Sequence, residues 1–254
     1  AGQARGGGGQ RHAHPRPPGN ARGERHQRSR RQHGDIDGVA ELQANLRARL
    51  ASTPEGFWLT GAMFDDTKLD KRLTIADLDA VSTRHPIAVN HRGGHTSWYN
   101  SKAFELAGVT RETPDPVGGR FTRDANGDLS GMVAELARGV LTRTGQRERF
   151  TPEQQRARGR QGMAHISRLL TATGLTTVHD AGADRNAIRA YEDARAGGEL
   201  RHRGYLMIRG AYEQLRDAGV YTGFGDELIG IGGVKYAEDG SASECTMLLS
   251  TPYV

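Results

Sequence analysis

The sequence has very little cysteine and no long apolar run. Cys245 is the only cysteine among 254 residues, so an internal disulfide is excluded, which fits a reducing compartment. No apolar stretch approaches the roughly 20 residues that a membrane-spanning helix needs. The N-terminal residues also lack the apolar core of a signal peptide. We therefore expect a cytoplasmic location and no insertion into membranes.

The first 34 residues lack large apolar side chains. No Val, Ile, Leu, Met, Phe, Trp or Tyr occurs before Ile36, so this segment cannot bury enough surface to offset its ordering entropy. Eight arginines and one glutamate give it a charge of +7 in a chain of net charge +5, which leaves −2 for the rest. Residues 1–34 are predicted to be a disordered basic leader. Translation of a G+C-rich coding region in the wrong frame would give the same composition, so the leader could also be non-native.

From Asp35 onward the composition is that of a globular protein. Capping boxes at Thr74–Asp77 and Thr151–Gln154 predict helix starts, and the second helix is expected to run to about Thr173. Asn126–Gly127 predicts the turn of a β-hairpin, within an excursion over about residues 110–150. The buried stripe of the long helix is predicted to include Met163, Ile166, Leu169 and Leu170.

Strands and helices alternate in the last hundred residues. Three short apolar runs predict strands, with helices over 186–196 and 211–218 between them. The predicted strands are Thr176–His179, His202–Ile208 and Leu228–Val234. This alternation is typical of βαβ units, so a parallel sheet is expected.

Polar side chains follow two of the predicted strands. The loop His91–Ser101 comes after the buried run Pro86–Val89, and such loops often carry chemistry. Its His95 and Asn100 would either bind a substrate or tie the loop to the next helix. His179 ends another strand, where it would either bond to the backbone or join a metal or substrate cluster.

Two further patterns bear on metal binding. His12-Ala13-His14 would point both imidazoles at one ion if it lay on a strand, but no apolar strand precedes it, so two histidines in disordered sequence is the simpler interpretation. Lys235 stands at the end of the run 228–234. Burial would make its amine nucleophilic and able to capture carbon dioxide as an anionic carbamate. The alternative is a lysine that extends from the strand into water.

Taken together, these stretches resemble amidohydrolase family 3, in the branch that contains N-substituted formamide deformylase. The similarity runs from about Asp35 to Val254, and five blocks carry it in order. The blocks are Gly94–Ala103, Thr113–Gly119, Asp128–Ala137, Gly174–Asp180 and Gly233–Ser241 with Pro252-Tyr253.

The resemblance implies an α/β fold, here a partial TIM (β/α)8 barrel of the metal-dependent hydrolase type. Residues 35–254 would form this incomplete barrel with an inserted hairpin subdomain, and the composite β-sandwich of the family would be absent. It also implies hydrolysis of non-peptide carbon–nitrogen bonds in a small-molecule amide by one or two divalent ions, with zinc expected. A homodimer is an option for a full-length parent.

The resemblance also implies roles for particular residues. Lys235, with His12 and His14 as matches to a first-strand pair, would hold the metal. The substrate would contact four residues, and the catalytic aspartate would lie beyond Val254, so this chain alone is expected to be inactive. The four substrate-binding residues are His95, Asn100, His179 and Asp239. The alternative is a non-catalytic α/β binding module whose basic arm binds nucleic acid; the rest of the chain carries nothing that favours it.

Overall fold

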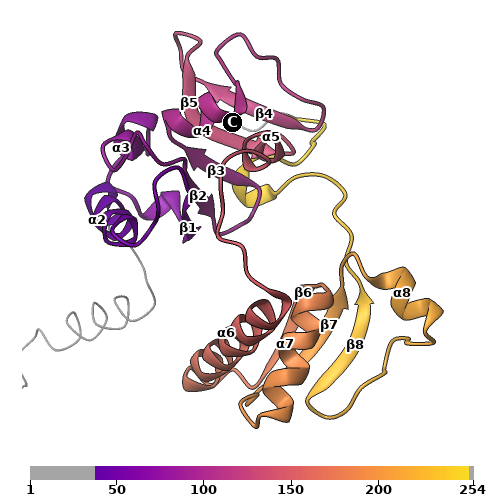
Figure 1. Cartoon of the computed structure of the whole chain (residues 1–254). Coiled ribbons are helices and arrows are strands. Elements are labelled where there is room, and N and C mark those ends of the chain that lie inside the picture. The colour runs from indigo at the N-terminus through magenta and orange to yellow at the C-terminus, as the bar shows by residue number, and fades with distance from the viewer. Residues whose placement is uncertain (1–37, 252–254) are drawn as a thin grey trace, which may run out of the picture.

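Two separate β-sheets with packed helices make up the protein in the computed structural model, which describes residues 38–251 (Figure 1). The first sheet has the strand order β1-β2-β3-β5-β4 and the second has the order β6-β7-β8. The strands are β1 (Leu59–Phe64), β2 (Ile87–His91), β3 (Thr96–Tyr99), β4 (Gly119–Arg123), β5 (Leu129–Glu135), β6 (Thr177–Ala183), β7 (Arg203–Ile208) and β8 (Ile229–Val234).

Helices connect these strands in both parts of the molecule. The α-helices are α2 (Val39–Leu50), α3 (Ile75–Asp79), α4 (Ser101–Ala107), α5 (Arg138–Thr142), α6 (Pro152–Ala172), α7 (Arg185–Ala196) and α8 (Tyr212–Asp217), and the 3-10 helices are η1 (Asp66–Lys68) and η2 (Ala242–Glu244). Within residues 38–251, none of the helices combines the length and the apolar content needed to cross a membrane. The fold is mixed α/β, as the sequence predicted. We call the part with the first sheet the first body and the part with the second sheet the second body.

The first sheet is mixed. Strands β1 and β2 are parallel, with Phe64 opposite His91 at their ends, while β2–β3, β3–β5 and β5–β4 are antiparallel. Strand β3 was not predicted, because residues 91–101 were interpreted as one loop. All four of its residues are buried, so it lacks the alternation of apolar and polar residues that identifies a strand in a sequence.

The predicted hairpin is confirmed. Gly127 has φ 82°, and the carboxylate of Asp124 accepts hydrogen bonds from the N–H groups of Asn126 and Asp128 at 2.8 and 3.0 Å. Because β5 pairs with β3, the hairpin extends the first sheet.

Both faces of the first sheet are covered. Ile87 and Val89 of β2 pack in one apolar cluster with residues of α2, while Ala88 packs in a second cluster with Phe104 of α4. Successive residues of a strand point to opposite faces, so a strand buried on both sides is apolar throughout. This explains the continuous run Ile87–Val89.

The second sheet is parallel throughout, as predicted. Helix α6 has the predicted capping box between Thr151 and Gln154, but its predicted buried stripe is partly wrong, because Ile166 is 47% exposed. Ala164 and Ser167 are buried instead. Helix α6 packs against α7, and Gly159 lies beside Ala190. Small residues therefore face this close helix contact.

Candidate functional site

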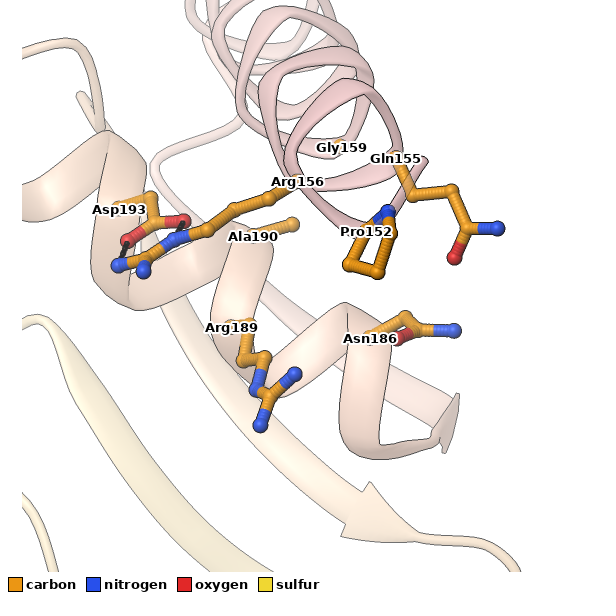
Figure 2. Close-up of a pocket in the computed structure, with 8 residues that line it drawn as sticks. All are labelled: Pro152, Gln155, Arg156, Gly159, Asn186, Arg189, Ala190 and Asp193. Atoms are coloured by element: carbon orange, nitrogen blue, oxygen red, sulfur yellow. Dashed lines mark hydrogen bonds and ion pairs between the residues drawn. The ribbon is translucent and has the colours of Figure 1, made fainter. Parts of the chain in front are cut away.

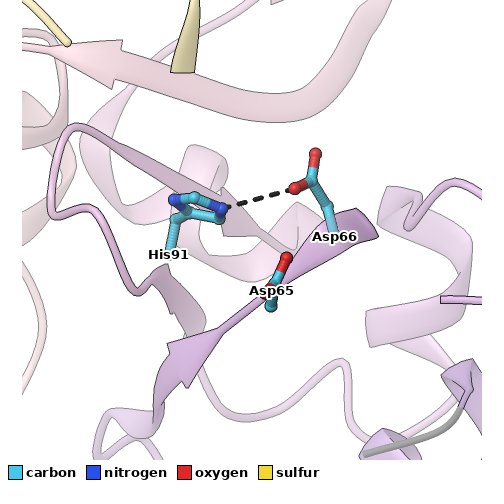
Figure 3. A group of neighbouring side chains, drawn as sticks. All are labelled: Asp65, Asp66 and His91. Carbon is cyan, nitrogen blue, oxygen red and sulfur yellow. Dashed lines mark ion pairs between the residues drawn. The ribbon is translucent and has the colours of Figure 1, made fainter. Parts of the chain in front are cut away.

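Two histidines and several carboxylates gather where β1, β2 and β5 of the first sheet end. Asp65 and Asp66 directly follow β1, and His91 ends β2, so the parallel pairing of these strands brings all three residues together. The Nε2 atom of His91 lies 3.3 Å from Oδ1 of Asp66. Figure 3 shows the three side chains, whose potential ligand atoms lie within 4.8 Å of one another.

Asp65 is already paired within this group. Its Oδ1 accepts hydrogen bonds from the backbone N–H and the hydroxyl of Thr67 at 3.2 and 2.7 Å. Its Oδ2 lies 2.9 Å from Nε of Arg92. The pKa of Asp65 lies below its ordinary value. The hydrogen bond from the Thr67 hydroxyl lowers it most, and the Thr67 N–H and Arg92 add to this effect, while burial opposes it. A cation at this carboxylate would have to displace Arg92, whereas Asp66 is half-exposed.

Glu244 reaches the same group from the far end of the chain. Its side chain is 2% exposed, and its Oε2 lies 3.2 Å from Nδ1 of His91. The hydroxyl of Thr96 donates to Oε2 at 2.5 Å, and the N–H of His95 donates to Oε1 at 3.3 Å. Burial raises the pKa of Glu244, but the bonds from Thr96 and His95 and the neighbouring His91 together hold the pKa below its ordinary value.

Gly93 makes room for this carboxylate. A Cβ atom at position 93 would lie 1.9 Å from Oε1 of Glu244, so any side chain there would push Glu244 out. The turn between β2 and β3 is therefore shaped to receive the residue.

His95 pairs with Glu135, the last residue of β5. Its Nδ1 lies 2.9 and 3.0 Å from the two carboxylate oxygens of Glu135. The backbone N–H of Glu135 donates to the carbonyl of His95 at 2.8 Å. The side chain of His95 is 29% exposed, so the imidazole is held from one side and reachable from the other.

Asn100 is buried and makes four hydrogen bonds to the backbone. Its Oδ1 accepts from the N–H groups of Ile87 and Ala103 at 2.8 and 3.2 Å. Its Nδ2 donates to the carbonyls of Ser82 and His85 at 2.8 and 2.9 Å. This is the tie between loop and helix that the sequence offered as one alternative. The predicted contact between Asn100 and a substrate stays a prediction. Both polar atoms of the Asn100 side chain are already engaged in these four bonds.

The remaining predicted site residues lie elsewhere. His179 is on β6, exposed, with its ring 4.9 Å from that of Tyr205 on β7. Lys235 directly follows β8; its backbone N–H donates to Ile208 at 2.9 Å, and the residue is exposed. Asp239 is exposed and accepts from the N–H of Leu248 at 3.0 Å. His12 and His14 lie outside the described residues.

The predicted site residues therefore lie in both bodies, and several residues that the structure brings together were not predicted. His95 and Asn100 flank β3 in the first body, while His179 and Lys235 belong to the second sheet. The missed residues are Asp65, Asp66, Glu135 and Glu244, while His91 was predicted only as part of a possible substrate-binding loop. A usable signal existed for the two aspartates and for His91, which follow apolar runs closely.

A shallow hollow of about 80 Å³ lies between α6 and α7. Figure 2 shows the residues that line it, among which Arg156 forms a two-pronged pair with Asp193, and Arg189 and Asn186 come from α7. It contains none of the predicted site residues.

Comparison with known proteins gives the class of this chain. A profile of the Amidohydrolase family matches residues 21–254. The mixed α/β fold is shared with the crystal structure of an uncharacterized metal-dependent hydrolase from Pyrococcus horikoshii OT3, with a TM-score of 0.51 at 24% identity over 86% of this chain and 41% of that chain. The protein belongs to the Amidohydrolase family.

Two proteins of known name are similar to this chain. A Bacillus subtilis (strain 168) protein named as the amidohydrolase YtcJ is 29% identical over 241 residues, which cover 86% of this chain and 42% of the relative. The N-substituted formamide deformylase of Arthrobacter pascens is 28% identical over 168 residues, which cover 65% of this chain and 30% of that enzyme. This chain therefore spans less than half the length of either relative.

Proposed function

We propose that the chain is part of a metal-dependent hydrolase that cleaves carbon–nitrogen bonds other than peptide bonds, with small amides as substrates. Membership of the Amidohydrolase family supports hydrolysis, and the name of one relative, a formamide deformylase, supports an amide substrate. The observation that carries the proposal is the position of Lys235. It follows the last strand of a parallel sheet, and the carboxyl ends of parallel strands are where such folds place their reactive groups.

The metal of this hydrolase would be a divalent ion, for which zinc is our proposal. Lys235 would become an anionic oxygen ligand when its neutral amine adds carbon dioxide and releases a proton, and His12 and His14 are proposed as its partners. Asp65, Asp66 and His91 also have the ligand types that zinc takes, but Arg92 already neutralises Asp65. We therefore place the ion at Lys235. When bound, it supplies Lewis acidity and a water of lowered pKa.

The residues of this chain would orient the substrate around that ion. His95 is partly exposed and rigidly held, so we propose that it contacts the amide. His179 is exposed on β6, in the sheet whose strand β8 precedes Lys235, and Asp239 is exposed in the segment that follows Lys235. Both are proposed to line the pocket.

The first test of this proposal is the detection of a carbamate on Lys235, which we expect to form. The chain is incubated with zinc and ¹³C-bicarbonate, and the carbamate carbon is observed by NMR. The signal should appear in the unchanged chain and vanish in Lys235→Ala, because alanine has no amine. Lys102→Ala, at a partly buried lysine of α4 that pairs with Glu105, is the control and should keep the signal.

Formate release from a simple N-alkyl formamide is then followed with and without zinc. We expect the chain by itself to turn over negligibly, and any turnover to require zinc and Lys235. Hydrolysis that survives both zinc removal and Lys235→Ala would overturn the proposed function.

A further inference from the structure

His95 is fixed at every polar atom except one. Its N–H donates to Glu244 at 3.3 Å, its carbonyl accepts from Glu135 at 2.8 Å, and its Nδ1 faces the Glu135 carboxylate at 2.9 Å. Arg138 of α5 also donates to the carbonyl of Gly94, the residue before it. Only Nε2 has no hydrogen-bond partner among residues 38–251.

Glu135 adopts a backbone conformation that this residue type avoids. Its φ is 52°, in the left-handed region that costs a non-glycine residue about 1 kcal/mol or more. In this conformation the residue supplies both its N–H and its carboxylate to His95. Such strain persists where the surrounding structure over-determines it, and it concentrates at functional positions.

The chemistry of the pair determines where the imidazole proton lies. An ionised carboxylate can only accept hydrogen bonds, so Nδ1 of His95 must carry a proton. In the neutral imidazole, Nε2 then has a lone pair and can only accept. A carboxylate behind a histidine fixes the tautomer and the ring orientation in this way in many enzymes.

We propose that Glu135 is a positioning residue that holds His95 as the Nδ1–H tautomer, so that Nε2 accepts a hydrogen bond from an N–H group of the substrate. The identity of that ligand rests on the proposed function; the pairing itself does not. The ligand class is an amide that retains an N–H on its nitrogen. An N,N-disubstituted amide has no proton to donate and is disfavoured at this site, because a buried or half-buried acceptor left unpaired is costly.

The tautomer is measured by long-range ¹H–¹⁵N correlation spectra of His95 at pH about 8.5, where histidine imidazoles in general are neutral. In the unchanged chain the Nδ1–H form should exceed the Nε2–H form by about tenfold or more, as expected for a charge-assisted hydrogen bond. Glu135→Gln should remove most of this preference, because an amide can donate as well as accept.

A glycine variant separates positioning from folding. Glu135→Gly suits the left-handed backbone, so the melting temperature should hold while the tautomer preference is lost. Glu105→Gln, at an exposed glutamate of α4, is the control and should change neither quantity. A dominant Nε2–H tautomer in the unchanged chain, or a preference that survives both Glu135 variants, would overturn the pairing.

The ligand is tested with N-methylformamide and N,N-dimethylformamide as probes. Titration with N-methylformamide should shift the ¹⁵N resonance of Nε2 of His95, and the dimethyl compound should not. Equal shifts, or none from either probe, would refute the N–H contact. Since neither measurement requires turnover or metal, a failure here is distinguishable from a missing carbamate at Lys235.

Discussion

Replacing Asn100 with alanine should lower the free energy of unfolding of the first body by about 3–5 kcal/mol. The change strands the buried N–H of Ile87 and two carbonyls, of Ser82 and His85, whereas the N–H of Ala103 keeps its bond to the backbone carbonyl of residue 100 at 3.2 Å. A buried polar group without a partner costs about 1–3 kcal/mol, and water entering the space would recover part of the sum. Asn100 also begins α4, and losing such a cap adds about 1 kcal/mol.

The measurement is urea denaturation followed by tryptophan fluorescence. Both tryptophans, Trp58 and Trp98, lie in the first body, so the signal reports on this part of the chain. Ser101→Ala is the matched control, because Ser101 is exposed and its hydroxyl donates to Asp79; it should cost no more than about 1 kcal/mol. A loss below about 1 kcal/mol for Asn100→Ala would show that these bonds are dispensable.

Gly93→Ala should release Glu244 from its site and free the residues around it. The added Cβ would lie 1.9 Å from Oε1 of Glu244, and the side chain can escape only by giving up Thr96, His91 and the N–H of His95. Hydrogen bonds to a charged group are worth about 1.5–3 kcal/mol, so amide hydrogen exchange of residues 241–248 should accelerate by about tenfold or more. Gly139→Ala, where a Cβ meets nothing within 4 Å, should leave exchange unchanged.

The same contact should depend on pH in a definite direction. The folded-state pKa of Glu244 lies below its ordinary value of 4.5. Its contribution to stability is therefore complete above that value and is lost as the pH falls through the folded-state pKa. The charged or titratable groups that face it are His91 and, across His91, Asp66. Glu244→Gln should match the unchanged chain in strong acid and exchange faster near pH 7. An equal difference at both pH values would argue against a role for this charge.

Local signals in the sequence predicted most of the elements. The capping boxes at Thr74 and Thr151 and the turn at Asn126–Gly127 are interactions within a few residues, so the sequence displays them directly. The strand and helix alternation of the second body also needs no distant partner to be recognised. Ile166 was misplaced because periodicity shows a stripe of apolar residues, whereas the side of α6 that packs against α7 presents small residues such as Gly159 and Ala164.

The site contacts that were missed join residues that are distant in the sequence. His95 meets Glu135 across 40 residues, and Thr96 meets Glu244 across 148. No spacing rule connects such positions. Strand β3 also could not be recognised from the sequence, because both of its faces are buried and its residues do not alternate between apolar and polar. The position of a strand-end lysine could be predicted, but its surroundings depend on how distant segments meet.

Glu244 brings the C-terminal segment back into contact with the first body. The polypeptide leaves the first body between α5 and α6, builds the second sheet, and returns to the first body at η2 (Figure 1). There Glu244 contacts His91 and Thr96. A hinge motion of the two bodies would strain the contacts of Glu244 with His91, Thr96 and the N–H of His95. Mild heating or denaturant should therefore separate the two bodies at Glu244 first, while each body stays folded and the linker keeps them joined. The backbone N–H of His95 would then lose its bond to Glu244 before the rest of the proposed site changes.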